Sequence, residues 1–174
     1  MPPRTLLQAD DVRRAITRMA HELVEHDPDA ERLVLLGIPT RGAVLAKRLG
    51  EQMTRIAGRE IPVGVLDVTL YRDDLAGQPT RPTRRTDVPV DLDGATVVLV
   101  DDVLYSGRTV RAALDAMNDI GRPDVVRLAV LVDRGHRDLP IRADHVGKNL
   151  PSARTERVMV RLSETDGLEQ VSIA

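Results

Sequence analysis

The sequence predicts an α/β fold in which a central, mostly parallel sheet is flanked by helices. Short apolar runs rich in β-branched residues recur at 33–38, 63–70, 97–100 and 125–132. Runs of this length and composition are typical of strands that are buried on both faces. Helical patterns separate several of these runs, and strands that alternate with helices form parallel sheets.

Composition indicates one globular domain, and we expect residues 1–174 to form it. The chain is 42% hydrophobic and 30% charged, which is ordinary for a domain with a real core. It has no cysteine, so disulfides and thiolate chemistry are excluded. No apolar run has the length of a membrane span and no secretory signal opens the chain, so we expect a cytoplasmic protein without a membrane partner. The net charge of −2 means that nucleic-acid binding needs a local basic surface.

The remaining elements follow in order along the chain. A first helix is expected from a cap at Asp10 or Asp11 to about His26, because an acidic cap and a following proline mark its ends. Further helices are expected from the turn at 37–42 to near Gly58 and from Val110 to about 120. No helix or strand is assigned within 133–151, and short closing strands are expected at 158–162 and 171–173.

Residues 97–109 carry the strongest chemical signal. They combine a buried strand, two adjacent carboxylates (Asp101 and Asp102) and a turn that leads into a helix. A helix start offers unpaired N–H groups and the positive end of a dipole, so a phosphate fits there. Carboxylates beyond the end of a parallel strand can accept hydrogen bonds from sugar hydroxyls. The turn adds hydroxyl donors and a glycine that permits close approach of a ligand, namely Ser106, Thr109 and Gly107.

A second turn, at 37–42, is predicted to bind an anion as well. Its glycines expose backbone N–H groups, and Arg41 supplies a fixed fork of donors suited to pyrophosphate. A plain strand–helix turn is the alternative for this segment taken alone.

The long segment 71–89, rich in proline, threonine and arginine, is predicted to be a lid rather than a plain surface loop. If the bound sugar phosphate loses a diphosphate from its anomeric carbon, a lid would exclude water from the oxocarbenium-like transition state, and its arginines would meet the departing diphosphate. Tyr71 and Arg72 begin this segment and are candidate catalytic residues.

Two further features bear on ligands. The strand at 125–132 ends near Val132 and Arg134, where a pocket could bind a nucleobase largely through backbone groups. The four histidines lack zinc-like spacing, so we expect no protein metal site. A Mg²⁺ ion carried by a diphosphate is the expected cofactor, because Mg²⁺ prefers few protein ligands together with phosphate oxygens.

Residues 97–109 resemble the signature for 5-phosphoribosyl-1-pyrophosphate (PRPP) of the type I phosphoribosyltransferases. The segments at 17–22, 69–75, 132–144 and 147–149 are similar to those of a narrower group. That group is the PyrR family, whose members regulate pyrimidine operons and act as uracil phosphoribosyltransferases. The resemblance covers nearly the whole chain.

The resemblance implies a type I phosphoribosyltransferase fold with a small hood and a flexible lid. The implied reaction converts uracil and PRPP to UMP and diphosphate with Mg²⁺. Asp101 and Asp102 would bind the ribose hydroxyls and stabilise positive charge at the anomeric carbon. Thr40 and Arg41 would hold pyrophosphate across a non-proline cis peptide. The 5′-phosphate would lie against the remaining signature residues, which are Val103, Leu104, Tyr105, Ser106, Gly107, Arg108 and Thr109.

The second implied role is binding of pyrimidine-operon messenger RNA, favoured by uridine nucleotides such as UMP and UTP. Composition alone favours a solvated face for the basic side of the first helix, and only the resemblance makes it an RNA surface. The family also forms homodimers and higher homo-oligomers. The residues that match its RNA-binding face are Thr17, Arg18, His21, Arg137, Arg142 and Lys148.

Three other functions stay open at this point: a salvage enzyme without an RNA role, an RNA regulator with vestigial catalysis, and a purine phosphoribosyltransferase. The intact acids argue against vestigial catalysis. The absence of Phe and Trp argues against a purine pocket, because such pockets often stack the base on an aromatic ring.

Overall fold

The structure is a computed structural model that describes residues 2–28, 30–73 and 86–174. Within these ranges it contains a five-stranded parallel sheet in the order β3-β2-β4-β5-β6 and a three-stranded antiparallel sheet in the order β1-β8-β7. The large sheet consists of β2 (Leu33–Gly37), β3 (Val63–Val65), β4 (Thr96–Leu104), β5 (Val125–Asp133) and β6 (His145–Asn149). The small sheet consists of β1 (Arg4–Leu7), β7 (Val158–Arg161) and β8 (Gln170–Ile173).

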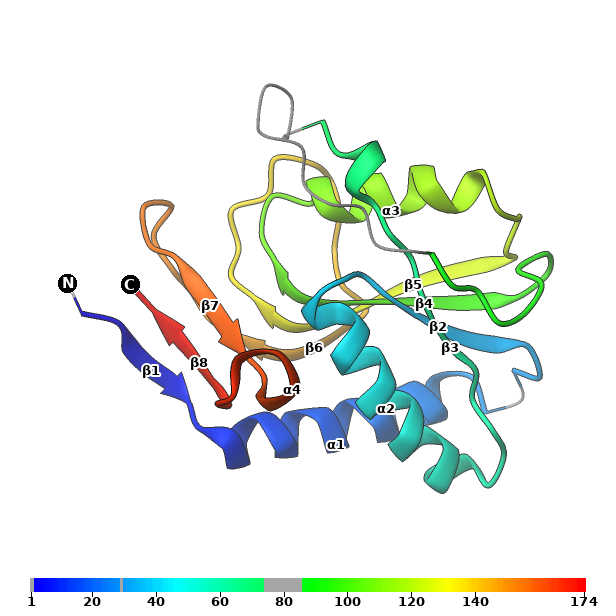
Figure 1. Cartoon of the computed structure of the whole chain (residues 1–174), viewed down its shortest axis with the longest axis horizontal. Helices are drawn as coiled ribbons and strands as arrows, with labels where there is room; N and C mark the ends of the chain where they lie inside the picture. The colour runs from blue at the N-terminus through cyan, green and yellow to red at the C-terminus, as the bar shows by residue number, and fades with distance from the viewer. Residues whose placement is uncertain (1, 29, 74–85) are drawn as a thin grey trace.

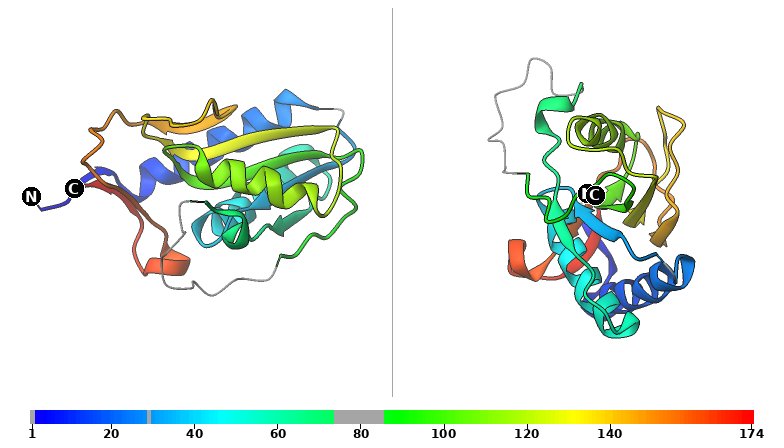
Figure 2. Two further views of the ribbon diagram at one scale, coloured as in Figure 1. Left: turned by 90° about the horizontal axis from the view of Figure 1, so that it is seen from above. Right: turned by 90° about the vertical axis from the view of Figure 1, so that its right-hand side faces the viewer.

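Helices cover both faces of the large sheet, as the sequence predicts (Figure 1, Figure 2). Among the described residues, α1 (Ala9–His26) and α2 (Arg41–Ala57) lie on one face and α3 (Arg108–Asn118) lies on the other. A short 3₁₀ helix, η1 (Thr69–Tyr71), and a short α-helix, α4 (Ser163–Asp166), are also present. None of the described helices is long and apolar enough to cross a bilayer.

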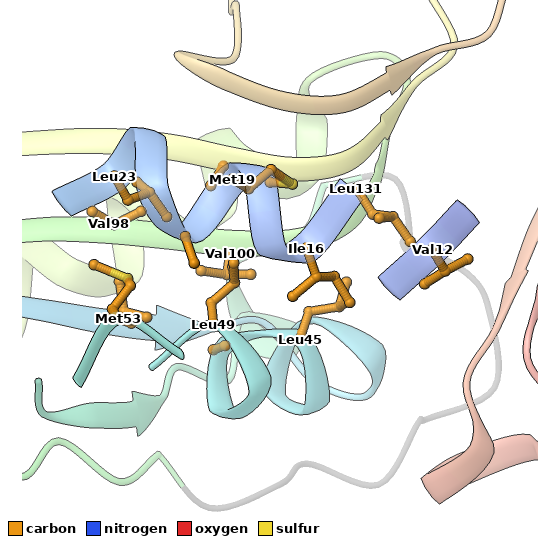
Figure 3. Close-up of a cluster of buried hydrophobic side chains, with 14 of the residues drawn as sticks. Val12, Ile16, Met19, Leu23, Leu45, Leu49, Met53, Val98, Val100 and Leu131 are labelled. Atoms are coloured by element: carbon orange, nitrogen blue, oxygen red, sulfur yellow. The ribbon is translucent and has the colours of Figure 1, made fainter. Parts of the chain in front are cut away.

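The core between the sheet and the pair α1 and α2 is aliphatic and includes two methionines (Figure 3). Met19 of α1 and Met53 of α2 are almost completely buried there, together with Val100 of β4. Gly147 of β6 permits the close approach of β5 as well as α1, because a Cβ at this position would lie 2.5 Å from the Leu131 carbonyl oxygen and 3.2 Å from the Met19 sulfur. A second cluster fills the space under α3. Both faces of the sheet are therefore buried, so a ligand is expected at the carboxyl ends of its strands.

The small sheet lies beside the carboxyl ends of the large sheet's strands and forms the expected hood (Figure 1). The predicted closing strands are confirmed as β7 and β8. The sequence analysis missed β1, which pairs with β8, and α4, because strands and helices of four residues carry too little periodicity to be recognised.

The predicted strand at 63–70 is wrong beyond Val65. The chain leaves the sheet because the Asp67 carboxylate accepts hydrogen bonds from both the N–H and the hydroxyl of Thr69, at 3.0 and 2.7 Å. These local bonds begin the 3₁₀ turn of η1 and compete with a strand ladder. β3 is consequently a short edge strand.

The boundaries around the 97–109 signature also differ from the prediction. β4 continues through both carboxylates to Leu104, because its ladder with β5 extends to the pair Leu104↔Asp133. α3 begins at Arg108 rather than Val110. The segment 133–151, to which the sequence analysis assigns no element, contains the edge strand β6. The residues of β6 are largely polar, so its sequence does not read as a buried strand.

The start of α1 differs from the prediction as well. Its N-cap is Gln8, not Asp10 or Asp11. The Asp11 carboxylate reaches back and accepts the Gln8 N–H at 2.9 Å, and this bond lowers the pKa of Asp11. An acidic residue near a helix start therefore fits either the cap or the first turn, and the sequence does not distinguish these positions.

Candidate functional site

Asp101 and Asp102 lie side by side near the carboxyl end of β4. Asp101 is buried, with 8% of its surface exposed, whereas Asp102 is half-buried. The Asp101 carboxylate accepts the Asp102 N–H at 2.8 Å. Burial, followed by the adjacent Asp102 charge, raises the pKa of Asp101 well above its usual value. Burial and the neighbouring charge therefore favour the protonated form of Asp101.

The turn after β4 is shaped to receive an anion. Gly107 has a φ of 95° and is the N-cap of α3, so the first N–H groups of an eleven-residue helix open onto this turn. The Ser106 carbonyl oxygen accepts the N–H groups of Asp138 and Leu139 at 2.9 and 3.1 Å. A small cavity of about 100 Å³ adjoins the turn, and its lining includes Arg72, Asp101, Tyr105, Ser106, Gly107 and Thr109. The turn and Asp101 thus border one space.

The second predicted anion turn lies next to the carboxylates. It contains a non-proline cis peptide between Pro39 and Thr40, within the segment where the family resemblance implies one. Arg41 begins α2, and its guanidinium binds Asp166 of α4 through Nε at 3.1 Å and Nη2 at 2.6 Å. This bond, together with the Asp102 charge, raises the pKa of Arg41. Arg41 is therefore within electrostatic reach of Asp102.

Gly42 permits this close arrangement of the two turns. A Cβ at this position would lie 2.5 Å from the Val100 carbonyl oxygen and 3.1 Å from the Asp101 Cα. Both atoms belong to the backbone of β4, which cannot easily move because it is paired on both sides. The start of α2 and the part of β4 that carries the two carboxylates are therefore in direct contact.

Gly42→Ala is expected to lower the free energy of unfolding by about 1–3 kcal/mol, because the added methyl group collides with the β4 backbone. Chemical denaturation measures this change. Gly50→Ala is the matched control in the same helix, since its added Cβ would meet chiefly a Val63 methyl group, which can rotate away. A Gly42→Ala protein no less stable than the Gly50→Ala protein would contradict the expected collision.

The two residues predicted to line a base pocket lie at and just after the end of β5, near the turn. Val132 and Arg134 are both buried. The Arg134 guanidinium carbon lies 4.2 Å from the Tyr105 ring centroid, and Nη2 donates to the Ala153 carbonyl oxygen at 2.8 Å. The buried Nε of Arg134 has no hydrogen-bond partner within the described residues. A buried donor of this kind is suited to a polar ligand atom.

Tyr71 and Arg72, the two predicted catalytic residues at the start of the lid, lie in different places. Arg72 lines the cavity beside the turn, and its charge acts on Asp101 to lower the pKa. The Tyr71 hydroxyl donates instead to Asp119, at the opposite end of α3 from the anion turn, and this bond raises the pKa of Tyr71. Of the predicted lid at 71–89, residues 74–85 lie outside the described residues, whereas Asp87 near its end pairs with Val65 of β3.

Four of the predicted RNA-binding residues lie on two elements that pack against each other, α1 and β6. Thr17, Arg18 and His21 are exposed on α1, and Lys148 is exposed on β6. Arg18 Nη2 donates to the Val146 and Gly147 carbonyl oxygens of β6 at 3.1 and 2.5 Å. The helix and the strand therefore present one continuous surface.

The other two predicted RNA-binding residues lie between β5 and β6. Arg142 is exposed. Arg137 is half-buried and donates to the Ile141 and Tyr105 carbonyl oxygens at 2.8 and 2.9 Å and to the Asp133 carboxylate at 2.5 Å. Arg137 thus links the turn after β4 to the segment that carries Arg142.

Several polar residues of this region were missed by the sequence analysis. Asp166 binds Arg41, and Asp133 binds Arg137. Asp73 pairs with Arg108 at 3.0 Å, which connects the lid root to the start of α3. The pairs of Asp166 and Asp73 join residues far apart in the chain, so no local sequence pattern could have indicated them. Among the described residues no group of three or more acidic or histidine side chains could hold a metal ion.

Comparison with a family model matches residues 4–161 to the phosphoribosyl transferase domain. "Bifunctional protein PyrR" of Leifsonia xyli is 58% identical over 99% of this chain and 97% of its own length. "Bifunctional protein PyrR" of Streptomyces coelicolor is 60% identical over 97% of this chain and 88% of its own length.

Solved structures show the same fold at low sequence identity. A hypoxanthine-guanine phosphoribosyltransferase from Bacillus anthracis superposes with a TM-score of 0.75 at 17% identity, over 98% of both chains. Hypoxanthine phosphoribosyltransferase from Trypanosoma cruzi, in complex with IMP, gives a TM-score of 0.74 at 19% identity, over 97% of this chain and 92% of the other. Likeness at this identity concerns the fold alone.

Proposed function

The chain belongs to the phosphoribosyl transferase family and, within it, to the bifunctional PyrR proteins, and we propose that it joins two functions. The first is transfer of a phosphoribosyl group from PRPP to uracil, which yields UMP and diphosphate. The second is binding of pyrimidine-operon messenger RNA in response to uridine nucleotides. The observation that best supports the first function is that both turns predicted to bind anions adjoin the carboxylate-bearing end of β4.

The carboxylate pair is proposed to hold the ribose and stabilise the transition state. As the bond between the anomeric carbon and diphosphate breaks and the bond to the base nitrogen forms, positive charge develops on the ribose ring. A negative charge on Asp102 stabilises this state, because it is fixed in a partly buried site before the reaction. Asp101, with its raised pKa, donates a hydrogen bond to a ribose hydroxyl.

The two turns bind the phosphate groups at either end of PRPP in this proposal. The N–H groups from Ser106 to Thr109 and the hydroxyls of this turn bind the 5′-phosphate, in the manner of helix N-termini. Thr40 and Arg41 bind the diphosphate. Bound Mg²⁺ would neutralise part of the diphosphate charge, held mainly through the diphosphate oxygens.

The base is proposed to lie against the end of β5. Val132 forms an apolar wall, and the unpaired Nε of Arg134 donates to a carbonyl oxygen of uracil. Arg72 approaches the reacting atoms from the root of the lid. Tyr71 is expected to reach them only if its bond to Asp119 breaks.

The proposed RNA surface consists of the exposed residues on α1 and β6 and of Arg142. Its support is the packing of α1 on β6, which brings basic side chains from distant parts of the sequence onto one surface. A homodimer or a higher homo-oligomer is part of the proposal, and light scattering would measure its mass.

The experiment that tests the enzymatic function is product formation from PRPP and Mg²⁺ with uracil, hypoxanthine, guanine or orotate. UMP formed from uracil, with little product from the other bases, is the expected result. Turnover of a purine alone would replace the proposal by a purine phosphoribosyltransferase. An absence of product with every base would leave an RNA regulator with vestigial catalysis.

A further inference from the structure

A paired hydrogen bond joins Arg41, at the end of the turn 37–42, to Asp166 of α4. Because α4 connects β7 to β8, we count it as part of the hood. Both oxygens of the Asp166 carboxylate are used, and the Arg41 side chain binds through Nε and Nη2. Its third nitrogen, Nη1, takes no part in this pair. A two-point bond of this kind fixes the plane of a guanidinium as well as its position.

Asp166 is itself firmly held. Its Oδ2 accepts the Leu162 N–H at 2.8 Å, and only 16% of its side chain is exposed. The Arg41 bond lowers the pKa of Asp166, so the carboxylate stays charged at neutral pH. Asp166 is therefore a fixed anion with a rigid backbone anchor.

A second arginine on α2 holds the same part of the hood. Arg48 lies seven residues after Arg41, on the same side of the helix. It binds Glu164 at 2.6 Å and Glu169 at 2.5 Å. Arg48 therefore attaches α4 to α2 without touching Arg41, and this separates two possible tasks of Asp166: attachment of the hood and orientation of Arg41.

We propose that Asp166 is a positioning residue that orients the Arg41 guanidinium for diphosphate. This inference rests on the proposed function and assigns to the hood a direct part in PRPP binding. The Nε and Nη2 edge of Arg41 binds the hood, and the Nη1 side is left for a phosphate oxygen. An Arg41 side chain without this partner has many rotamers, and PRPP would have to select one of them.

A competing role for Asp166 would change PRPP affinity in the opposite direction. If Asp166 instead occupies Arg41 in place of diphosphate, as one anion displaces another, its removal would strengthen PRPP binding. A positioning role predicts weaker binding. The direction of the change therefore separates the two roles.

The experiment compares Asp166→Asn with Glu164→Gln, a control on the same short helix that loses only a contact to Arg48. Calorimetry measures Kd for PRPP with Mg²⁺, and steady-state kinetics measure KM for PRPP and for uracil. Asp166→Asn is expected to raise Kd and KM for PRPP about tenfold and to change KM for uracil less than about twofold. Glu164→Gln is expected to change each constant less than about twofold.

Equal effects of the two variants would overturn the proposal, because they would show that Asp166 only attaches the hood. Tighter PRPP binding by Asp166→Asn would also overturn it. If Asp166→Asn does not fold, Asp166→Glu takes its place. Its longer side chain displaces Arg41, so weaker PRPP binding is expected and unchanged binding would overturn the proposal.

Calorimetry also keeps this proposal distinct from the enzymatic function. A wild-type protein that binds PRPP but forms no UMP would contradict the proposed catalysis, and the Kd comparison would still test Asp166. A wild-type protein that does not bind PRPP would overturn both.

Discussion

Replacement of Asp102 by asparagine is expected to lower kcat for UMP formation by about 10²–10³-fold. The physical reason is that Asp102 carries the negative charge of the pair, whereas burial and the neighbouring charge favour a protonated Asp101. The amide keeps the size of the side chain and removes the charge that stabilises the ribose cation. Initial rates at saturating PRPP and uracil measure the loss.

Asp101→Asn is the matched control for this prediction. An amide resembles a protonated carboxyl group in shape and in its ability to donate a hydrogen bond, so a loss of only about tenfold is expected. Circular dichroism and thermal unfolding would establish that both variants fold. A larger loss from Asp101→Asn than from Asp102→Asn would contradict the assignment of the charge to Asp102.

His21→Ala and Arg142→Ala are each expected to weaken binding of pyrimidine-operon leader RNA about tenfold in the presence of UMP. Both side chains are exposed, and neither lines the cavity at the anion turn. Uracil phosphoribosyltransferase activity should therefore change little. Filter binding or fluorescence anisotropy measures the RNA affinity, and the same protein samples serve for the activity assay.

Arg13→Ala provides the control for this second prediction. Arg13 is an exposed arginine on the same helix, paired with Asp10, and is not among the predicted RNA-binding residues. Its replacement should leave RNA affinity within about twofold. Loss of an Arg142 contact to a phosphate should also reduce the slope of log K against log salt by about 0.7–0.9. An unchanged slope and an equal effect of Arg13→Ala would argue against this surface.

The sequence determined the parts of the fold that depend on local pattern. The helices near 10–26 and 41–57 and the strands at 33–37 and 125–133 are found within a few residues of the prediction, because long amphipathic or apolar segments carry their own signal. The strand–turn–helix signature at 97–109 likewise needs only neighbouring residues. Its two carboxylates, its glycine and its hydroxyls could therefore be read directly as a site for a ribose phosphate.

The tertiary structure decided what depends on residues far apart in the chain. β6 is a strand because β5 pairs with it, although its polar sequence resembles a loop. The strand at 63–65 ends early because Asp67 forms local hydrogen bonds with Thr69. The partnership of Arg41 with Asp166 spans 125 positions, and no periodicity or spacing encodes it. The sequence therefore determined the chemistry of the individual segments, and only folding decided which charged groups meet and which of the two adjacent aspartates is buried.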